Sequence, residues 1–232
     1  MPESTPSPRV LGVDACTKGW VGASSDVRVY FGVTIDKLVA TAEADGPPLA
    51  VVAIDIPIGL PTSGPREADR LARSLVGKRW QSVFGTPIRA ALEAATHAEA
   101  TALSLAATGK GISQQAHRLG PKILEVDTWT RATDRTVIEA HPEVSFATIA
   151  GHPLEHPKST WSGAQERLAL LAAVGIVLPA DVGEAGAMAA VDDVLDAAVV
   201  SWTAARYASG TAVSYPTTPE TIGDEPCAVI WA

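Results

Sequence analysis

The sequence predicts an α/β fold built on a mixed sheet that is antiparallel over its first strands and parallel afterwards. Three short apolar runs at 9–14, 20–24 and 28–33 are separated only by tight polar turns, which indicates an antiparallel meander. A helical pattern over 34–45 then leads to a fourth strand pattern at 49–56. Because a strand that follows a helical crossover usually runs parallel to its neighbour, we expect 49–56 to pair in parallel with one of the first three.

The next segment, 61–135, is almost wholly helical in pattern and differs in charge from the rest of the chain. It holds eleven Lys and Arg against seven Asp and Glu, a local balance of +4, whereas the whole chain has a net charge of −8. We therefore predict a basic, mostly helical insertion within a single domain that spans 9–232. The helices expected in it are 66–76, 87–107 and 113–130, the last interrupted near Gly120-Pro121.

After this insertion the pattern returns to the sheet. The order of three strands, a helix and a strand opens a ribonuclease H-like sheet, although other mixed sheets share it. The remaining elements expected are a strand at 136–140, a helix from Pro142 through Ile149, a helix at 160–174, a turn or short helix at 179–186, a long helix at 191–208 and an edge strand at 227–231.

Composition argues against several classes of protein. The acidic net charge argues against a protein that coats nucleic acid without specificity. Two distant cysteines, Cys16 and Cys227, predict neither a disulfide framework nor a structural zinc site, and a reducing cytoplasm fits them best. The longest apolar stretch, 168–180, is too short to span a bilayer, and we expect residues 1–8 to form a disordered tail.

Acidic residues stand where strands end, which predicts a metal site. Asp14 and Asp55 each close an apolar run, and Asp193 and Asp196 lie three residues apart near the start of the last long helix. A charge at a buried strand end is unfavourable unless something cationic meets it. Carboxylate oxygens suit Mg²⁺ or Mn²⁺, and three or four of them are what a two-metal phosphodiesterase needs.

Each acid also has a purely structural explanation. Asp192 or Asp193 could cap the helix that they open, because acids at a helix N-terminus accept free backbone N–H groups. Asp14 and Asp55 could stabilise the turns that follow them. Capping does not explain acids at several strand ends, so the metal site is the favoured interpretation.

A further acid and two nearby groups are open to more than one interpretation. Glu139 ends another strand pattern and could be a fourth catalytic acid with His141 as general base, or the two could form a polar pair at the entrance of the next helix. Lys18 could approach a phosphate or be a solvated turn lysine. Cys16 is not predicted to be a nucleophile, because no sequence feature assigns it a base.

Two groups of basic residues are candidate phosphate ligands. Arg66, Arg70 and Arg73 follow one helical stripe, although ion pairs with Asp69 and Glu67 explain them equally well. Lys158 and Arg167 form a second possible anion cradle. The sequence does not decide whether either group binds phosphate.

Several strings spread over about 10–231 form a distinctive combination, although no single one is specific. The strings are Gly12-Val13-Asp14-Ala15 with Gly19-Trp20, Ile54-Asp55-Ile56-Pro57-Ile58-Gly59-Leu60, Arg66 with Ala68-Asp69 and Ala72-Arg73, Glu139-Ala140-His141-Pro142-Glu143 with Ser145-Phe146, Lys158 with Gly163 and Glu166-Arg167, and Asp193 with Asp196-Ala197. Together they resemble a bacterial and archaeal family of predicted RNase H-like nucleases, domain of unknown function 429.

The resemblance implies a ribonuclease H-like fold more firmly than it implies a reaction, because the nuclease label of the family rests on fold and acidic residues. The segment from Asp193 to Ala197 is also similar to the last helix of Holliday-junction resolvases. By that similarity Asp14, Asp55, Asp193 and Asp196 take the catalytic positions. The long helical insertion and the acidic net charge depart from a stand-alone junction resolvase.

The leading hypothesis is therefore a Mg²⁺- or Mn²⁺-dependent nuclease or phosphodiesterase that acts on nucleic acid or a nucleotide. A second is an ATP-binding phosphotransferase-like protein, since Asp14 with Thr17 resembles a first phosphate loop, although the sequence lacks a glycine-rich second loop. A third is a binding module that has lost catalysis. No membrane partner is expected, and the sequence leaves the oligomeric state open.

Overall fold

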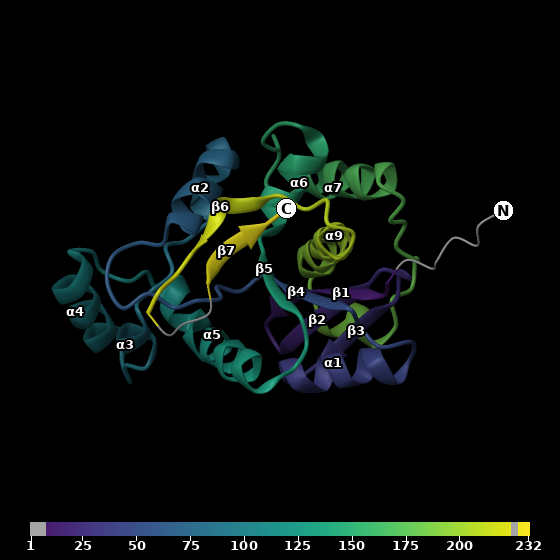
Figure 1. Ribbon diagram of the computed structural model, residues 1–232. Helices are drawn as coiled ribbons and strands as arrows, with labels where there is room; N and C mark the ends of the chain where they lie inside the picture. Colours follow the sequence, from purple (N-terminus) through teal and green to yellow (C-terminus); the bar gives the residue numbers. More distant parts are fainter. Residues whose placement is uncertain (1–7, 224–226) are drawn as a thin grey trace.

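A computed structural model describes residues 8–223 and 227–232, so the tail predicted at 1–8 lies outside the described residues except for Pro8. Within that part of the chain the centre is a seven-stranded mixed sheet with the order β3-β2-β1-β4-β5-β7-β6 (Figure 1). The strands are β1 (Val10–Cys16), β2 (Gly19–Ser24), β3 (Val29–Gly32), β4 (Val51–Ile54), β5 (Val137–Ala140), β6 (Ser214–Glu220) and β7 (Ala228–Trp231).

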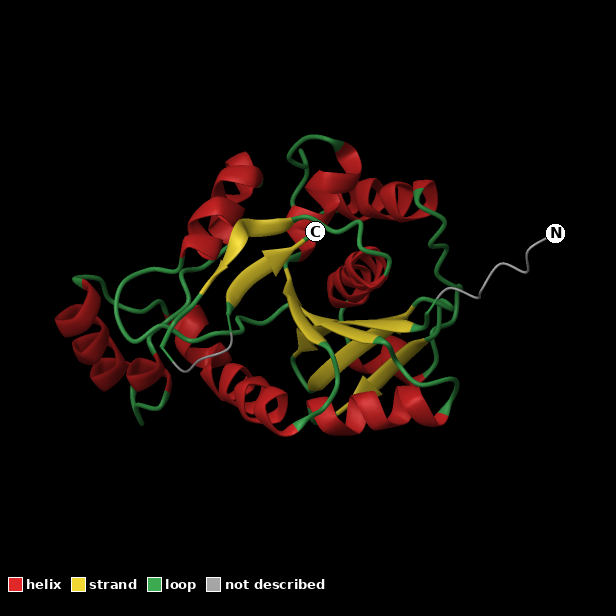
Figure 2. Ribbon diagram, in the orientation of Figure 1, coloured by secondary structure: helices red, strands yellow, loops and turns green. Residues whose placement is uncertain are grey.

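Helices cover both faces of this sheet. They are α1 (Ile35–Ala44), α2 (Glu67–Leu75), the 3-10 helix η1 (Gly77–Ser82), α3 (Arg89–Leu92), α4 (His97–Thr108), α5 (Gln114–Ala132), α6 (Pro142–Ala150), α7 (Trp161–Ala173), α8 (Glu184–Met188) and α9 (Val191–Ala208). Helix α9 lies on one face with α6 and α7 beyond it, and α1 and α5 lie on the other (Figures 1 and 2). Among the helices of residues 8–223 and 227–232, none is both long enough and apolar enough to cross a bilayer.

The strand pairing confirms a mixed sheet. Strands β1, β2 and β3 pair antiparallel in sequence, and β4 joins β1 in parallel, followed by β5 and β7 in parallel. In the β1–β4 register Val13 lies opposite Ile54, and the Asp55 N–H donates to the Val13 carbonyl at 2.9 Å. Asp14 and Asp55 are therefore the next residues along two neighbouring parallel strands.

Helix α9 approaches β1 unusually closely, and the approach depends on Gly12. A Cβ at Gly12 would lie 2.0 Å from the Ser201 backbone nitrogen and 2.3 Å from the Ala197 carbonyl oxygen. The helix face that meets the sheet carries small buried residues, including Ala197, Ala198 and Ala204. Because the backbones touch, the start of α9, with its acidic residues, is fixed relative to the end of β1.

Two expectations for the helical segment are wrong in detail. Helix α5 continues through Pro121, although this proline cannot donate the hydrogen bond that a helix interior requires. Ile123 and Val126 are fully buried in the core beneath α1, and their burial stabilises the helix on the far side of the proline. The helix predicted at 87–107 is two helices, because Thr96 accepts from the Glu99 N–H and begins α4 anew.

The C-terminal strands also differ from the expectation. The strand β7 exists as predicted, but it lies inside the sheet between β5 and β6 rather than at the edge. The edge strand on this side of the sheet is β6, and because Pro216 and Pro219 interrupt its pattern, the sequence predicts no strand there. Proline is compatible with an edge strand, where one side makes no ladder hydrogen bonds.

We predict that Gly12→Ala lowers the free energy of unfolding by about 3 kcal/mol, because the added methyl group collides with the α9 backbone rather than with a movable side chain. Urea unfolding followed by far-UV circular dichroism measures this change. Gly85→Ala is the matched control: its Cβ would meet only the Arg73 Nη2 at 3.6 Å, so stability should change by less than about 0.5 kcal/mol. Equal stability of the Gly12 variant and the parent would contradict the close approach.

Candidate functional site

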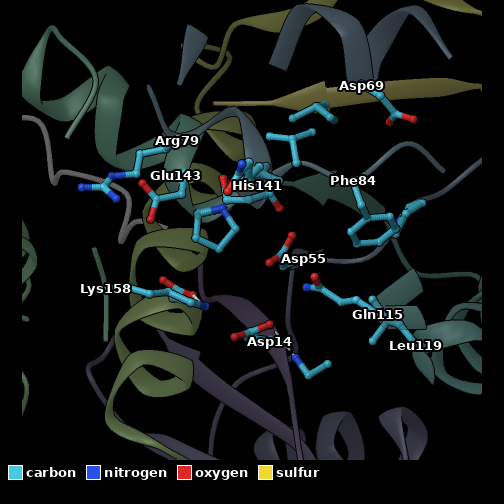
Figure 3. Close-up of a pocket in the computed structure, with 18 of the residues that line it drawn as sticks. Asp14, Asp55, Asp69, Arg79, Phe84, Gln115, Leu119, His141, Glu143 and Lys158 are labelled. Carbon is cyan, nitrogen blue, oxygen red and sulfur yellow. Dashed lines mark hydrogen bonds and ion pairs between the residues drawn. The ribbon is translucent and has the colours of Figure 1, made fainter. Parts of the chain in front are cut away.

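A pocket of about 460 Å³ opens at the carboxyl ends of β1, β4 and β5. This edge is where ligands of open α/β sheets usually bind. Figure 3 shows Asp14 and Asp55 near its centre, Lys158 and Glu143 on one side, and Phe84, Gln115 and Leu119 on the other. All the acids predicted to hold metal line it, namely Asp14, Asp55, Asp193 and Asp196.

The two strand acids reach the pocket from neighbouring strands. Asp14 is buried, with 6% of its surface exposed, and its Oδ1 accepts from the Ala15 N–H at 2.7 Å. This contact leaves the other oxygen of Asp14 without a hydrogen-bond partner among the described residues. Asp55 follows β4 directly and is partly exposed, and its side chain makes no hydrogen bond within the described chain. Stabilisation of the following turn therefore accounts for one oxygen of Asp14 and for neither oxygen of Asp55.

The two helix acids have different roles. Asp193 lies at the start of α9, and its Oδ2 accepts from the Ala190 N–H at 3.1 Å, so this residue caps the helix. Asp192, the other candidate for a cap, lies 3.6 Å from the Lys158 ammonium instead. Asp196 is 2% exposed and points its Oδ2 at Lys158 Nζ, 2.6 Å away. The Asp196 Oδ1 is buried and has no hydrogen-bond partner among the described residues.

The loop that carries Lys158 is held in place by a second close approach. A Cβ at Gly163 would lie 1.9 Å from the Pro157 carbonyl oxygen, so only glycine lets this loop lie against α7. Thr160 caps α7 by accepting from the Gly163 N–H at 3.1 Å. The short path from Pro157 to the helix therefore directs Lys158 back towards α9.

Burial and mutual repulsion raise the pKa values of these acids. Burial raises the pKa of Asp14 well above its usual range, and Asp55 and Asp196 raise it further. Burial raises the pKa of Asp196 to about 6, although Lys158 opposes it. The pKa values of Asp55 and Asp193 are also raised, chiefly by burial. Asp14 and Asp196 are therefore buried carboxylates with an oxygen that accepts no hydrogen bond among the described residues, and Asp55 and Asp193 are partly buried beside them.

Lys158 is the cation that these acids share. Burial lowers the pKa of its ammonium, but Asp196 and Asp14 outweigh burial and raise the pKa above the usual range. One positive charge meets several negative ones, so the cluster is not neutralised by the chain itself. This donor set of carboxylate oxygens, with the buried and unpartnered Asp196 Oδ1, fits a hard divalent cation in its chemistry.

The acids are not arranged as a finished ligand set. Within residues 8–223 and 227–232, no group of three or more His, Cys, Asp or Glu side chains lies in an arrangement that could hold a metal ion. The ammonium of Lys158 lies against Asp196, one of the predicted ligands. A divalent cation would therefore require the carboxylates to draw together and Lys158 to move away.

Glu139 lies in a separate network beside the acids. Both of its oxygens accept from the Arg66 guanidinium, at 2.8 and 2.7 Å, and Oε2 also accepts from the Ile58 N–H at 2.7 Å. Arg66 in turn pairs with Asp69 at 2.6 Å, and the Thr86 N–H donates to Asp69 at 2.7 Å. Burial raises the pKa of Glu139, although Arg66 opposes it. These contacts occupy Glu139 and join β5 to α2 and the loop after β4.

The predicted phosphate ligands other than Lys158 lie elsewhere or are occupied. Arg66 is 1% exposed, and burial lowers its pKa, but Glu139 and Asp69 outweigh burial and raise it. Arg167 is fully buried and pairs with Glu143. The alternative explanation of the stripe, ion pairs with Asp69 and Glu67, is therefore the one that the structure shows. The others do not line the pocket: Arg70 pairs with Glu67, Arg73 donates to the Val83 carbonyl at 2.7 Å, and Lys18 is exposed beside Met188.

Several residues that line the pocket are not predicted from the sequence. Lys78 and Arg79 of η1 line the pocket, as do Phe84 and Gln115. The available signal was the basic pair directly before Trp80, but no periodic pattern predicts a 3-10 helix there. His141, which sequence reasoning considered, lines the pocket beside Asp55, and its buried ring Nδ1 has no hydrogen-bond partner within the described residues.

This fold and pocket define a class of protein: a mixed α/β domain with an under-neutralised acidic pocket at the carboxyl ends of its parallel strands. The chain belongs to the DUF429 family, described as a protein of unknown function, whose family model matches residues 12–221. No curated protein and no solved structure matches the chain.

We predict that Asp14→Asn raises the free energy of unfolding at pH 8 in the presence of EDTA. The pKa of Asp14 is raised in the folded state, so the parent loses stability as the pH rises through that pKa, and the variant does not. The difference should vanish below the unfolded pKa of Asp, about 3.9. Urea unfolding at several pH values measures it, with exposed Asp134→Asn as a control that should show no such trend.

Proposed function

We propose that this protein is a divalent-metal-dependent phosphodiesterase, most specifically a nuclease, with Mg²⁺ or Mn²⁺ as its cofactor. The observation that carries the proposal is the convergence of Asp14, Asp55, Asp193 and Asp196 on one pocket, where Lys158 is the only cation in ion-pair contact with any of the four within the described residues. These residues come from three separate parts of the sequence. A fold gathers buried carboxylates at such a cost in free energy when they serve a ligand.

The fold supports this proposal through its topology. The three antiparallel strands, the parallel β4 and β5, and a long helix packed against β1 are the arrangement expected of a ribonuclease H-like domain. The acids occupy the ends of β1 and β4 and the start of α9, the positions that the resemblance to nucleases of this superfamily implies. We therefore extend the proposal to a ribonuclease H-like fold.

Each acid has a distinct part in the proposed site. Asp14 and Asp55, adjacent at the sheet edge, would hold one ion between them, and Asp196, with its free Oδ1, would complete a second position. Asp193 is partly committed to capping α9 and would act as a weaker ligand. When bound, a pair of divalent ions supplies Lewis acidity for the phosphoryl oxygens and makes water a stronger nucleophile.

The cations of the pocket would bind the phosphate. Lys78 and Arg79 line it from η1, and Lys158 lines it from the loop before α7. The Arg79 Nη2 donates to the Glu155 carbonyl, and its Nε is buried without a partner among the described residues. Arg66 and Arg167 would act only by supporting the walls of the pocket, since both are buried and paired with Glu139 and Glu143.

We predict that Asp14→Asn and Asp55→Asn each lower Mn²⁺-dependent hydrolysis of a nucleic acid or nucleotide phosphodiester by at least about 100-fold, because each removes half of a charge pair that an ion requires. Cleavage of single-stranded and duplex substrates, with and without EDTA, measures the change. Asp134→Asn should retain the parent's activity. Parent and Asp14 variant being equally active, or equally inert, would overturn the proposal.

We also predict that Lys158→Met tightens Mn²⁺ binding about tenfold, because the ion no longer competes with a positive charge 2.6 Å from Asp196. Isothermal titration calorimetry measures this affinity directly. Lys78→Met, which removes a pocket lysine that makes no ion pair among the described residues, should change affinity by less than roughly twofold. Weaker Mn²⁺ binding by the Lys158 variant would contradict the idea that the ammonium and the ion compete for Asp196. No Mn²⁺ binding by the parent would favour an inactive binding module.

A further inference from the structure

The six tryptophans divide into two groups by exposure. Trp20 is fully buried, Trp129 is 9% exposed, and Trp202 and Trp231 are partly buried. The other two, Trp80 and Trp161, are 53% and 78% exposed. Neither is among the residues that pack against the buried apolar clusters of the described chain. Because exposing so large an apolar ring is unfavourable, these two tryptophans need an explanation outside the core.

Both exposed tryptophans lie close in sequence to cations that line the pocket. Trp80 directly follows Lys78 and Arg79 in η1, and Trp161 follows Lys158 by three residues at the start of α7. The two segments are in contact, since Arg79 donates to the carbonyl of Glu155 in the loop that leads to Lys158. The tryptophans therefore lie in two adjoining segments, 78–82 and 155–161, which both contribute residues to the pocket lining and together form what we call the rim.

Local structure does not account for either ring. Helix α7 is capped by the Thr160 side chain, so the Trp161 ring is not needed to begin it. In η1 the Val83 N–H bonds to the backbone carbonyl of Trp80, a contact that any side chain would allow. The pocket is lined by the residues on both sides of Trp80 but not by Trp80 itself, which places its ring outside the cavity.

We propose that this rim binds single-stranded nucleic acid, with Trp80 and Trp161 as platforms on which unpaired bases stack. The proposal rests on the proposed function for what happens to the strand inside the pocket. An exposed aromatic ring beside lysine or arginine is the combination that binds single strands without reading sequence, since every base offers a flat face. A duplex hides those faces in its own stack, so the rim selects unpaired strands.

The charge of the protein agrees with this mode of binding. At a net charge of −8, the surface cannot attract a long phosphate backbone broadly. Among the described residues that line the pocket, Lys78 and Arg79 make no ion pair, and Lys158 is already paired with Asp196. Stacking supplies affinity that does not depend on charge. The salt dependence of binding should therefore be shallow, reflecting about two or three phosphate contacts.

A protein partner is the competing occupant, and the surroundings of the tryptophans disfavour it. Gln81 and Ser82 follow Trp80, and Thr160 and Ser162 flank Trp161, so polar residues adjoin each tryptophan in the sequence. A protein-docking surface of useful size has a contiguous apolar centre, which these isolated rings do not make.

The test measures binding of a fluorescently labelled single strand of about 12 nucleotides by anisotropy, in an Asp14→Asn background so that the strand is not cut. We expect Trp80→Ala and Trp161→Ala each to weaken binding about 5- to 100-fold, and Phe at either position to restore most of the affinity. Leu105→Ala, which removes a 50% exposed apolar side chain on α4, should have no effect. The corresponding duplex should bind at least about tenfold more weakly than the single strand.

The outcomes separate this proposal from the nuclease proposal. Unchanged affinity in both alanine variants, or equally tight duplex binding, overturns stacking on the rim. Thermal unfolding of each variant establishes that it is folded, and since both rings are exposed, their removal should leave the melting temperature within about 2 °C of the parent's. Tight, tryptophan-dependent binding by a parent that cuts nothing supports the rim and rejects the nuclease. Cleavage that is unchanged in both alanine variants, together with unchanged affinity, supports the nuclease and rejects stacking on the rim.

Discussion

Repulsion among buried carboxylates, only partly offset by Lys158, is the constraint on which the rest of the structure depends. Burial and neighbouring acids raise the pKa values of Asp14 and Asp196, and the partly exposed Asp55 also has a raised pKa, chiefly from desolvation. One ammonium at 2.6 Å from Asp196 cannot neutralise them all. The core must therefore be stable enough to hold a charge imbalance that the pocket itself does not resolve.

Close backbone packing at two glycines fixes the elements that carry this charge. Gly12 lets α9 rest directly on β1, and Gly163 lets the Lys158 loop rest directly on α7. Backbone contacts of this kind have little freedom to relax, so the acids of α9 and the ammonium of Lys158 are held against the strand ends. The same two approaches thus determine both the packing of the domain and the geometry of its pocket.

A second charged network, that of Arg66 with Glu139 and Asp69, performs a structural task beside the first. Its members satisfy one another and the backbone, and it closes the wall between β5 and α2. Glu139 has the same sequence pattern as Asp14, because both lie near the carboxyl end of a parallel strand. Both oxygens of Glu139, however, accept hydrogen bonds from Arg66. The difference between a paired acid and a free one depends on a partner 73 residues away in the chain.

The sequence by itself predicted the mixed sheet and its strand directions over the first four strands, because strand alternation, turns and crossover direction are local properties. It also predicted that Asp14, Asp55, Asp193 and Asp196 lie near one another, and all four line one pocket. Tertiary structure alone decided that Pro121 stays inside a helix, that a proline-containing strand forms the sheet edge, and which basic residues remain available. Arg66 and Arg167 look like surface cations in the sequence but are buried, whereas Lys158 reaches the acids. The reason is physical: burial and ion pairing are set by contacts between distant segments, and no local pattern records them.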